Sequence, residues 1–337
     1  MPEKVSVIGG GVIGLSAAWQ LAEQGFDVTL YHADPIGAGA SGNAAGALKP
    51  FDALQTGWKQ NLQQESLWMY PAFLKDVVAA SGVEVPLNRC SRLAVYDRAP
   101  SFEKAARAAQ KANKDWPFTP AQTVLDESAL KKHLPDVEES VLGGVICHAT
   151  ATFNPQTLLK ALHACCLNKG VSFKHQALDE LPAGKVVIAA GAYSQQFASG
   201  VNVRPIKRQA ILLEWPEQTP LERITENGQV YLVPWQGGKA LYVGSTFEPE
   251  AGFDATPTLE AETHLRQQAA RLYPRLLKAK LLERFSGLQS RCGGEGSSLF
   301  LGPVKGRAGV FMATGHGGVG FCMAPITAQK LCEMLTA

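Results

Sequence analysis

The sequence predicts an α/β fold in which a parallel sheet is joined to a second, α+β domain with a mixed sheet. Two observations predict the parallel sheet. Residues 4–34 read as strand, glycine-rich turn, helix and strand, and residues 310–337 repeat the first three of these. A third observation, the short alternating strands with turn signals over 200–285, predicts the mixed sheet. The 337 residues, 46% of them hydrophobic, are enough for two such domains.

The first unit carries a glycine fingerprint. Val5 to Ile8 is a short β-branched strand, and Gly9, Gly11 and Gly14 follow it in G-x-G-x-x-G spacing at the start of a helix. Such glycines permit a tight turn, close approach of a pyrophosphate, and packing of the helix on the strand. The free N–H groups of the helix N-terminus favour phosphate. We therefore predict a Rossmann-type dinucleotide site at five residues: Gly9, Gly11, Val12, Ile13 and Gly14.

The end of the second strand departs from this fingerprint. An acidic residue usually stands there and bonds the adenosine ribose. Here the place is held by His32 and Ala33, and Asp34 follows. Imidazole can also bond a hydroxyl, so we assign His32 and Ala33 to the cofactor site. The alternative is a doubly wound fold with a degraded site.

Residues 37–48 are dominated by small side chains. Such a stretch forms a loop or helix start against something large and flat, and its Ser41 and Asn43 can donate hydrogen bonds to the cofactor. A flexible linker is the alternative, but alanine and asparagine dilute the composition that linkers need. The predicted contacts are Ser41, Asn43, Ala44, Ala45, Gly46 and Ala47.

The middle of the chain alternates helices and strands. We expect helices over 58–78, over the basic run 104–114, and from Asn154, which suits an N-cap before Pro155. The run 104–114 is a solvated helix or, less plausibly, an anion or RNA contact. Strands follow at 171–173 and 185–190. The second ends in small residues, so Ala190 and Gly191 can touch the cofactor closely.

Residues 200–285 are expected to form the mixed sheet. Strands are predicted at 209–215, 229–234 and 240–246, with Gly237-Gly238 as a hairpin turn. A helix is expected over 259–273, stopped by Pro274.

A second glycine-rich turn lies near the C-terminus. It follows the strand 310–314 and leads to a helix predicted from about Ala324, with Pro325 in its first turn. Two anion-binding turns far apart in the sequence suggest that each binds one end of a long cofactor. The first turn would hold the pyrophosphate, and the second turn would face a ring that gains negative charge on reduction. The residues assigned here are Gly315, His316, Gly317, Gly318, Val319 and Gly320.

Charge and cysteine content exclude several classes of protein. A net charge of +2 argues against a strongly basic nucleic-acid surface, and no apolar run reaches membrane-spanning length. The first strand begins near residue 5, so we expect no signal peptide. The seven cysteines contain no C-x-x-C, so we predict no metal site or disulfide framework but a reduced, cytoplasmic protein.

Five motifs in order resemble the D-amino-acid oxidase/glycine oxidase family of FAD-dependent oxidoreductases: Gly9–Gly14, Gly39–Gly46, Val186–Ser194, Tyr231–Pro234 with Val243–Thr246, and Ala313–Gly320. The chain is also similar to the FAD half of the enzyme that makes 5-methylaminomethyl-2-thiouridine in tRNA, without room for its methyltransferase half. The resemblance implies a glutathione-reductase-type domain that binds FAD non-covalently, assigned to 1–80, 140–200 and 285–337. It implies a substrate domain at 81–139 and 201–284.

The resemblance also implies a reaction: hydride transfer to FAD from the carbon of a C–N bond in a small amine or amino acid, with oxygen or an unknown acceptor. Family members often carry an arginine that grips the substrate carboxylate where this chain has Gln289. We predict that Arg291, two residues on, replaces it; a surface ion pair is the alternative. Lys207 and Arg208 either extend the site for a larger anion or face solvent.

Two further residues are candidates for the site. His316 either bonds the ring or substrate, or braces its loop, and Tyr231 could close the site from the substrate domain. Two other functions stay open: oxidation of a modified tRNA nucleoside, and a flavoprotein that has lost its activity.

Overall fold

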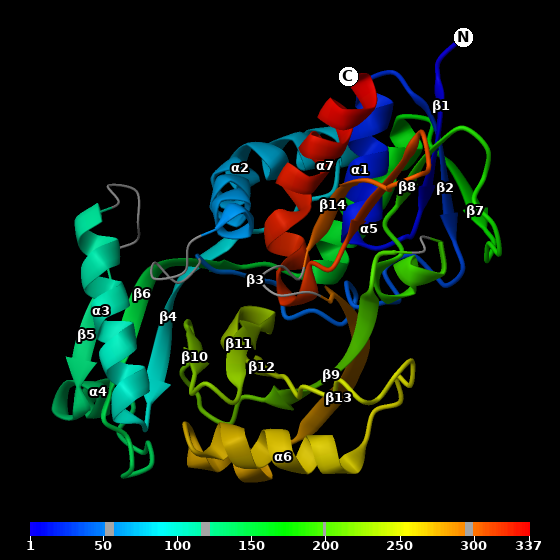
Figure 1. The fold of residues 1–337 in the computed structure, drawn as a ribbon. Helices are drawn as coiled ribbons and strands as arrows, with labels where there is room; N and C mark the ends of the chain where they lie inside the picture. Colours follow the sequence, from blue (N-terminus) through cyan, green and yellow to red (C-terminus); the bar gives the residue numbers. More distant parts are fainter. Residues whose placement is uncertain (51–56, 116–121, 198–199, 294–298) are drawn as a thin grey trace.

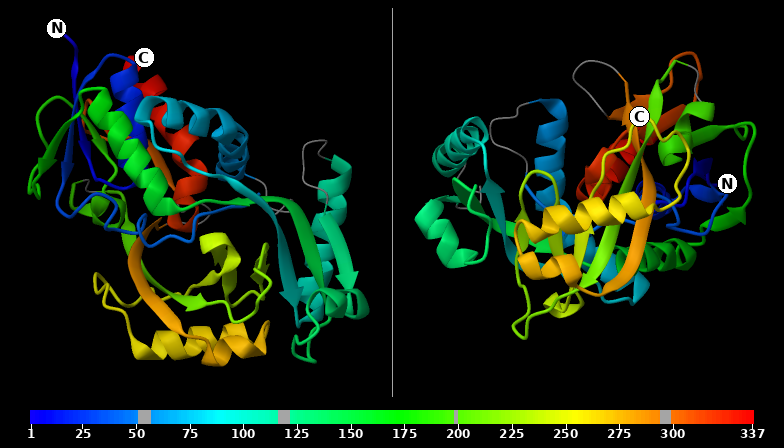
Figure 2. Two further views of the ribbon diagram at one scale, coloured as in Figure 1. Left: turned by 180° about the vertical axis from the view of Figure 1, so that it is seen from behind. Right: turned by 90° about the horizontal axis from the view of Figure 1, so that it is seen from below.

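Two sheets, stacked one above the other, organise the chain (Figure 1). The structure is a computed structural model and describes residues 1–50, 57–115, 122–197, 200–293 and 299–337. Both termini lie on the upper, six-stranded sheet, and the helix α6 (Leu259–Ala270) lies beneath the lower, nine-stranded one. Figure 2 shows the two layers from behind and from below. The site described below is lined by residues of both layers.

The upper sheet has the strand order β14-β15-β8-β1-β2-β7. Its central strands are β1 (Lys4–Ile8), β2 (Asp27–His32) and β8 (Lys185–Ile188), which pair in parallel. β7 (Ser172–His175) and β15 (Val310–Thr314) extend it in parallel, and β14 (Phe300–Pro303) closes one edge antiparallel to β15. The C-terminal ends of β1, β8 and β15 therefore meet at one edge, where cofactors bind in open α/β sheets.

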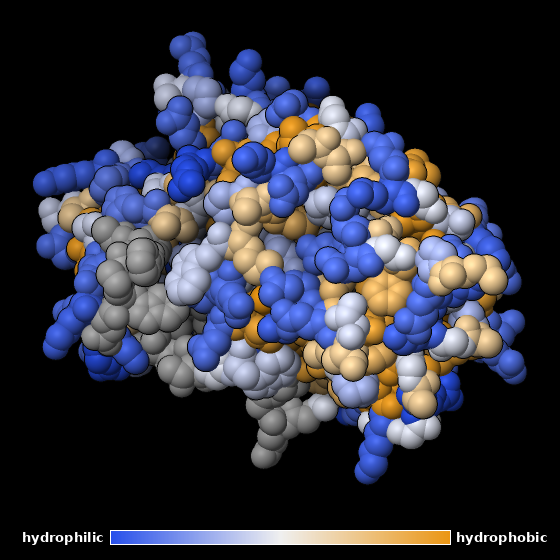
Figure 3. Space-filling model, turned by 90° about the horizontal axis from the view of Figure 1, so that it is seen from above, coloured by the Kyte–Doolittle hydropathy of each residue, from blue (hydrophilic) through white to orange (hydrophobic). Residues whose placement is uncertain are grey.

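Four helices pack together on one face of this sheet: α1 (Val12–Glu23), α2 (Trp58–Ser81), α5 (Pro155–Asn168) and α7 (Gly320–Thr336). Their apolar faces share a core with the inward residues of β1 and β2. Asn154 accepts hydrogen bonds from the N–H groups of Gln156 and Thr157, so the predicted N-cap of α5 is confirmed. Seen from above, the outer face is mostly hydrophilic with scattered apolar residues (Figure 3).

The other face of the upper sheet carries a smaller core of Ile8, Val186, Ile188, Val310 and Met312. The 3-10 helix η1 (Gly191–Phe197) follows β8 directly and buries Phe197 against it. This helix places the residues after β8 at the edge where the turn after β1 lies.

The lower sheet runs β13-β9-β12-β11-β10-β4-β6-β3, and β5 also pairs with β6. It is mixed, because β10 and β4 are parallel and the other pairs are antiparallel. Its strands are β3 (Ala47–Leu48), β4 (Asn88–Tyr96), β5 (Gln122–Asp126), β6 (Gly143–Thr152), β9 (Val203–Glu214), β10 (Ile224–Glu226), β11 (Tyr231–Trp235), β12 (Ala240–Gly244) and β13 (Leu281–Cys292). Gln236–Gly238 (η2) forms the predicted hairpin turn.

The two faces of the lower sheet have different partners. Ile211, Leu213 and Val243 point down to α6 and share a core with its Leu265. The opposite face points up to the first domain: Trp235 Nε1 donates to the Ala45 carbonyl and Tyr242 Oη to the Asn43 carbonyl. The helices α3 (Ala99–Asp115) and α4 (Glu127–His133) lie with β5 at the far end, and η3 (Pro274–Lys278) follows α6.

Three strands of the lower sheet lie wholly or partly in segments predicted for the FAD-binding domain. β6 lies within 140–200 and β3 within 1–80, yet the two pair with each other in the lower sheet. β13 crosses the predicted boundary at 285 and pairs with β9 over its whole length. The local pattern missed this because a strand's sheet is decided by its distant partner.

The C-terminal helix also begins earlier than predicted. α7 starts at Gly320 rather than near Ala324, so Pro325 lies inside the helix and not in its first turn. The predicted helix over 259–273 is confirmed to Ala270, before Pro274 opens η3. Within the described ranges, no helix is long and apolar enough to cross a membrane.

Candidate active site

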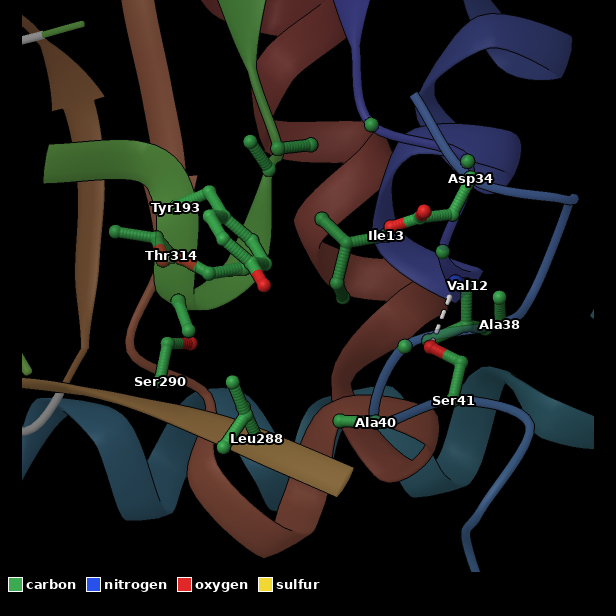
Figure 4. A pocket seen from close by; sticks show the side chains of 18 of the residues that line it. Val12, Ile13, Asp34, Ala38, Ala40, Ser41, Tyr193, Leu288, Ser290 and Thr314 are labelled. Atoms are coloured by element: carbon green, nitrogen blue, oxygen red, sulfur yellow. Dashed lines mark hydrogen bonds between the residues drawn. The ribbon is translucent and has the colours of Figure 1, made fainter. Parts of the chain in front are cut away.

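A cavity of about 600 Å³ lies at the C-terminal edge of the upper sheet, between it and β13. The turns after β1, β2, β8 and β15 line it from above, and residues 286–290 of β13 line it from below. In Figure 4, Ile13 and Asp34 stand on one side of this cavity, Tyr193 and Thr314 on the other, and Leu288 and Ala40 beneath. Its volume is within the range of cofactor and ligand sites.

The turn after β1 needs its glycines. Gly9 has φ +119°, and a Cβ there would lie 2.3 Å from the Ala189 carbonyl oxygen. A Cβ on Gly14 would lie 1.9 Å from the Gly9 carbonyl oxygen. Gly9 thus permits the turn, and Gly14 permits α1 to pack against it, as predicted. A Cβ on Gly11 would lie 3.1 Å from Ser41 Oγ, which is a tight contact.

Ser41 completes the N-terminus of α1 from a distance of 29 residues. The N-cap residue Gly11 has no side chain to cap the helix, and Ser41 Oγ accepts the N–H of Val12 at 3.0 Å (Figure 4). The remaining N–H groups of the first turn are available to an anion. Asn43 does something else: its amide donates to the Gly39 and Ala38 carbonyls, so it braces the loop.

The ribose end of the predicted site carries two histidines. The ring of His32 stacks on that of His175, with centroids 5.0 Å apart, and its Nδ1 lies 2.9 Å from the Asp34 carbonyl oxygen. Asp34 itself points into the cavity (Figure 4). A carboxylate is thus present near the place of the usual acidic residue, but in the turn after β2 rather than on the strand.

The second glycine turn joins the two layers. The Gly315 N–H donates to Ser290 Oγ of β13 at 3.0 Å. His316 is 5% exposed, and its Nε2 lies 3.0 Å from Thr327 Oγ1 of α7. Burial, with a smaller effect of the Lys59 charge, lowers the pKa of His316 to about 3. The imidazole is therefore neutral at physiological pH and braces its loop against α7.

Most of the residues predicted to bind the cofactor come together at the cavity. Those that line it are Gly9, Gly11, Val12, Ile13, His32, Ala33, Ser41, Ala44, Ala190, Gly191, His316, Gly317, Gly318 and Gly320. Those outside its lining are Gly14, Asn43, Ala45, Gly46, Ala47, Gly315 and Val319. Several of the second group support the first: Gly46, for example, has φ +73° and would carry a Cβ 2.0 Å from the Phe153 carbonyl oxygen.

The predicted substrate residues Arg291 and Tyr231 lie on the upward face of the lower sheet, on β13 and β11 with two strands between them, and neither lines the cavity. Gln289 and Arg291 share that face of β13, since side chains alternate along a strand. Arg208 of β9 is in register with Gly287, and Tyr231 lies on the same face beyond β12. Gln289 also lines the cavity and lies beside Gly318, so this face adjoins the second glycine turn.

Tyr231 borders a charged cluster on the same face. Lys49 Nζ lies 5.4 Å from the centre of its ring and 3.3 Å from Glu226 Oε2. Arg92 bonds the other oxygen of Glu226 at 3.1 Å. Burial raises the pKa of Glu226, but Lys49 and Arg92 outweigh that effect and hold it below its ordinary value. The positive charges of this cluster thus have a carboxylate partner.

Lys207 is buried and paired with a carboxylate. It is 2% exposed, lies on the opposite face of β9 from Arg208, and its Nζ is 3.0 Å from Asp254 Oδ2. Its ion pair anchors the segment 245–258, whose Ala255 reaches the cavity. Lys207 therefore does not face solvent, which was one of the two alternatives, and it is not among the residues that line the cavity.

Several cavity residues escaped the sequence analysis. Tyr193, Leu288 and Ser290 stand around the cavity opposite α1 (Figure 4). Tyr193 lies two residues after Gly191, just beyond the strand end predicted to touch the cofactor, so the sequence could have indicated its place at the cavity. Leu288 and Ser290 gave none, because only the register of β13 on β9 brings them to the cavity.

The cavity fits FAD. It offers a glycine cradle and free N–H groups at α1 for a pyrophosphate, and a second glycine turn some 300 residues later in the chain for the far end of the cofactor. The lining is largely backbone and small side chains, which lets a large planar group lie close to the chain.

Comparisons with known proteins agree with this geometry. A glycine oxidase from Pseudomonas putida is 28% identical over 366 residues, which cover 100% of this chain and 95% of that protein. The crystal structure of glycine oxidase from Geobacillus kaustophilus superposes with a TM-score of 0.89 at 22% identity, over 99% of this chain and 95% of that one. Iminodiacetate oxidase from Chelativorans sp. gives a TM-score of 0.86 at 20% identity, over 98% and 95%.

The family model described as FAD dependent oxidoreductase, named DAO, matches residues 4–334. This confirms the family predicted from the five motifs. The chain therefore belongs to the DAO family of FAD-dependent oxidoreductases.

Proposed function

We propose that this protein binds FAD non-covalently and oxidises the C–N bond of a small amine or amino acid. One observation carries the proposal: the glycine-lined cavity opens beside a sheet face that holds Tyr231, Gln289 and Arg291. The oxidation of an amino acid requires a redox cofactor, which the cavity could hold, and a polar, cationic surface beside it, which the sheet face provides.

The cofactor contacts follow from the cavity lining. The N–H groups of α1, capped in part by Ser41, would hold the pyrophosphate. His32, Ala33 and Asp34 would hold the ribose end, and Ala44, Gly317 and Gly318 would lie against the flavin. The thiol of Cys322 is buried, which raises its pKa, and it contacts the Ala47 carbonyl, so it is poorly placed and poorly activated for a covalent bond.

A bound FAD would supply the two-electron acceptor for oxidation of the C–H bond next to the amine nitrogen to an imine, which water would hydrolyse, and oxygen or another acceptor would take the electrons on. The protein's part is to bind and orient. Arg291 would grip the substrate carboxylate in place of the family arginine, and Tyr231 would close the site. His316 would act as a positioning residue, because its Nε2 is engaged with Thr327.

Anaerobic bleaching of the bound flavin tests the function. The panel is glycine, N-substituted glycines, D- and L-amino acids, simple amines, and tRNA carrying carboxymethylaminomethyl groups. We expect one class of small amine to bleach the flavin rapidly. Bleaching by the tRNA alone would assign the protein to RNA modification, and a flavin that nothing on the panel reduces would contradict the proposed function.

A further inference from the structure

We propose that Arg208 and Arg291, which both contact the ring of Phe247, hold two carboxylates of one substrate, so that the substrate is a dicarboxylic amino acid. This inference rests on the proposed function and narrows it to a substrate class. It makes Arg208 a specificity-determining residue.

The two guanidinium groups converge on one aromatic ring. The Cζ atom of Arg208 lies 4.6 Å from the centre of the Phe247 ring, and that of Arg291 lies 5.6 Å from it. The two come from adjacent antiparallel strands, β9 and β13, on the face that adjoins the second glycine turn. Stacking against a ring keeps a guanidinium flat and leaves its N–H edge free to meet a carboxylate.

In the part of the chain that the structure describes, Arg208 and Arg291 lack a carboxylate partner, unlike two other cations on this face of the sheet. Lys49 and Arg92, farther along the same face, share Glu226. Arg208 and Arg291 make no ion pair with any residue in the described ranges. Arg208 donates from Nη1 to the Thr246 carbonyl, and its Nε is buried with no hydrogen-bond partner there. Arg291 is exposed to solvent, but the buried, unpaired donor of Arg208 is costly unless an anion binds there.

The mutual effect of the charges agrees with this geometry. Burial lowers the pKa of Arg208, the charge of Arg291 lowers it further, and the phenol of Tyr231 raises it. A guanidinium stays protonated in proteins nonetheless. A bound anion would therefore relieve the repulsion without any proton transfer.

The segment that carries the half-exposed ring of Phe247 is tied to β9. Phe247 lies between Thr246 and Glu248, which are both tied to Gln209 of β9: Thr246 Oγ1 accepts the Gln209 N–H at 2.9 Å, and Gln209 Nε2 donates to Glu248 at 2.9 Å. Lys207 anchors the same segment farther on through Asp254. The backbone of Phe247 is thus fixed beside Arg208 and Arg291, which favours a pair of guanidinium groups that is preorganised for binding.

Two carboxylates fit this arrangement better than one. Each guanidinium can bind one carboxylate with two parallel hydrogen bonds, so a monocarboxylate would leave one cation unpaired. Gln289 lies beside Gly318 and between the positions of the two arginines along β13. Arg291 is two residues after Gln289, and Gly287, which is in register with Arg208, is two residues before it. A substrate whose amine lies near Gln289 could therefore extend one carboxylate to each arginine. An N-carboxymethyl amino acid or an acidic amino acid has this form.

The test compares dicarboxylic and monocarboxylic substrates. Anaerobic flavin reduction is measured with iminodiacetate and D- and L-aspartate against glycine and sarcosine, in the wild type, Arg208→Met and Arg208→Lys. We expect kcat/KM for the best dicarboxylate to exceed that for glycine at least tenfold. Arg208→Met should lower kcat/KM for the dicarboxylate roughly 30-fold and change kcat/KM for glycine less than about threefold, since only the second carboxylate loses its partner. Arg208→Lys should recover part of the loss.

A matched control and a binding assay separate the two proposals. Arg275→Met removes an exposed arginine that pairs with Glu217 far from the site, and should change no substrate preference. Calorimetric titration of the holoprotein with malonate and acetate needs no turnover: malonate should bind at least tenfold more tightly, and Arg208→Met should abolish the difference.

The outcomes are distinct. Equal kcat/KM values for glycine and the dicarboxylates would overturn this inference but not the proposed amine oxidation. The same holds if Arg208→Met lowers kcat/KM equally for both substrates. If no compound reduces the flavin, the proposed function fails, and the titration still decides whether the arginine pair binds two carboxylates. Reduction by tRNA alone, with no preference for malonate, would overturn both.

Discussion

The cofactor cavity and the upward face of the lower sheet are built in different ways. The cavity is lined by turns in which backbone and small residues do the work: Gly9, Gly11 and the turn 315–320. The sheet face presents long side chains, Arg208, Tyr231, Gln289 and Arg291, from three strands. The first depends on φ angles and close approach, whereas the second depends on register.

This difference predicts different responses to mutation. A turn that only glycine can form fails completely when a Cβ is added, because the backbone must move. A side chain on a sheet face can be exchanged without moving the sheet, so its loss changes specificity and leaves the fold intact. Four experiments test this contrast, in order of decreasing expected effect.

Gly9→Ala should abolish FAD binding. Its Cβ would lie 2.3 Å from the Ala189 carbonyl oxygen at φ +119°, so the turn that approaches the pyrophosphate cannot form. The flavin-to-protein ratio from visible absorbance measures the loss. Gly25→Ala is the control: Gly25 also has positive φ, +87°, but nothing within 4 Å of its Cβ position, and its variant should keep FAD. Full FAD content in Gly9→Ala would mean that this turn does not hold the cofactor.

Arg291→Met should raise KM for the reactive substrate roughly 100-fold with little change in FAD content, because a charge-assisted carboxylate contact is lost on the sheet face alone. Steady-state kinetics and the visible spectrum measure the two effects. Arg204→Met is the comparison, since Arg204 is exposed and in register with Arg291 on the neighbouring strand. An unchanged KM in Arg291→Met would remove this residue from the site.

The buried His316 should make the protein less stable in acid. Its pKa is about 3 in the folded protein and near 6.5 when unfolded, so below pH 6.5 only the unfolded chain takes up the proton. Stability is fully present above pH 6.5 and falls by about 1.4 kcal/mol per pH unit as the pH drops toward 3.

Urea unfolding at pH 7 and pH 5 measures this effect. The wild type should lose about 2 kcal/mol more between the two than His316→Gln, which cannot titrate. His264→Gln, at an exposed position on α6, should keep the wild-type loss. Equal pH dependence of the wild type and His316→Gln would show that the buried imidazole is not its source.

Ser41→Ala should have the smallest effect, about 1 kcal/mol of stability, because the Val12 N–H loses its partner. It should also weaken FAD binding, since the same helix N-terminus faces the cofactor. Asn154→Ala removes the cap of α5 and should cost a similar amount without affecting FAD. Thermal unfolding and FAD titration of both variants make the comparison, and equal FAD affinity would separate capping from cofactor binding.

The sequence predicted the cavity better than the sheet face. Gly9, Ser41, Gly191 and Gly318 were found because turn glycines and small residues signal themselves locally, next to a strand and a helix. Asn43 does not line the cavity, and its amide donates within its own loop, which the sequence did not indicate. Lys207 and Arg208 were adjacent candidates, and only the alternation of the strand sent one down to Asp254 and the other up to Phe247.

The family, the glycine cradle and the presence of two sheets could be predicted from the amino-acid sequence, because they depend on backbone conformation and apolar periodicity, which neighbouring residues encode. Which strands belong to the lower sheet, and which cations meet, could be seen only in the folded protein. β6, β13 and the Arg208–Phe247–Arg291 cluster are brought together by pairing between segments far apart in the chain. One residue of slip in that register would turn every one of these side chains to the other face.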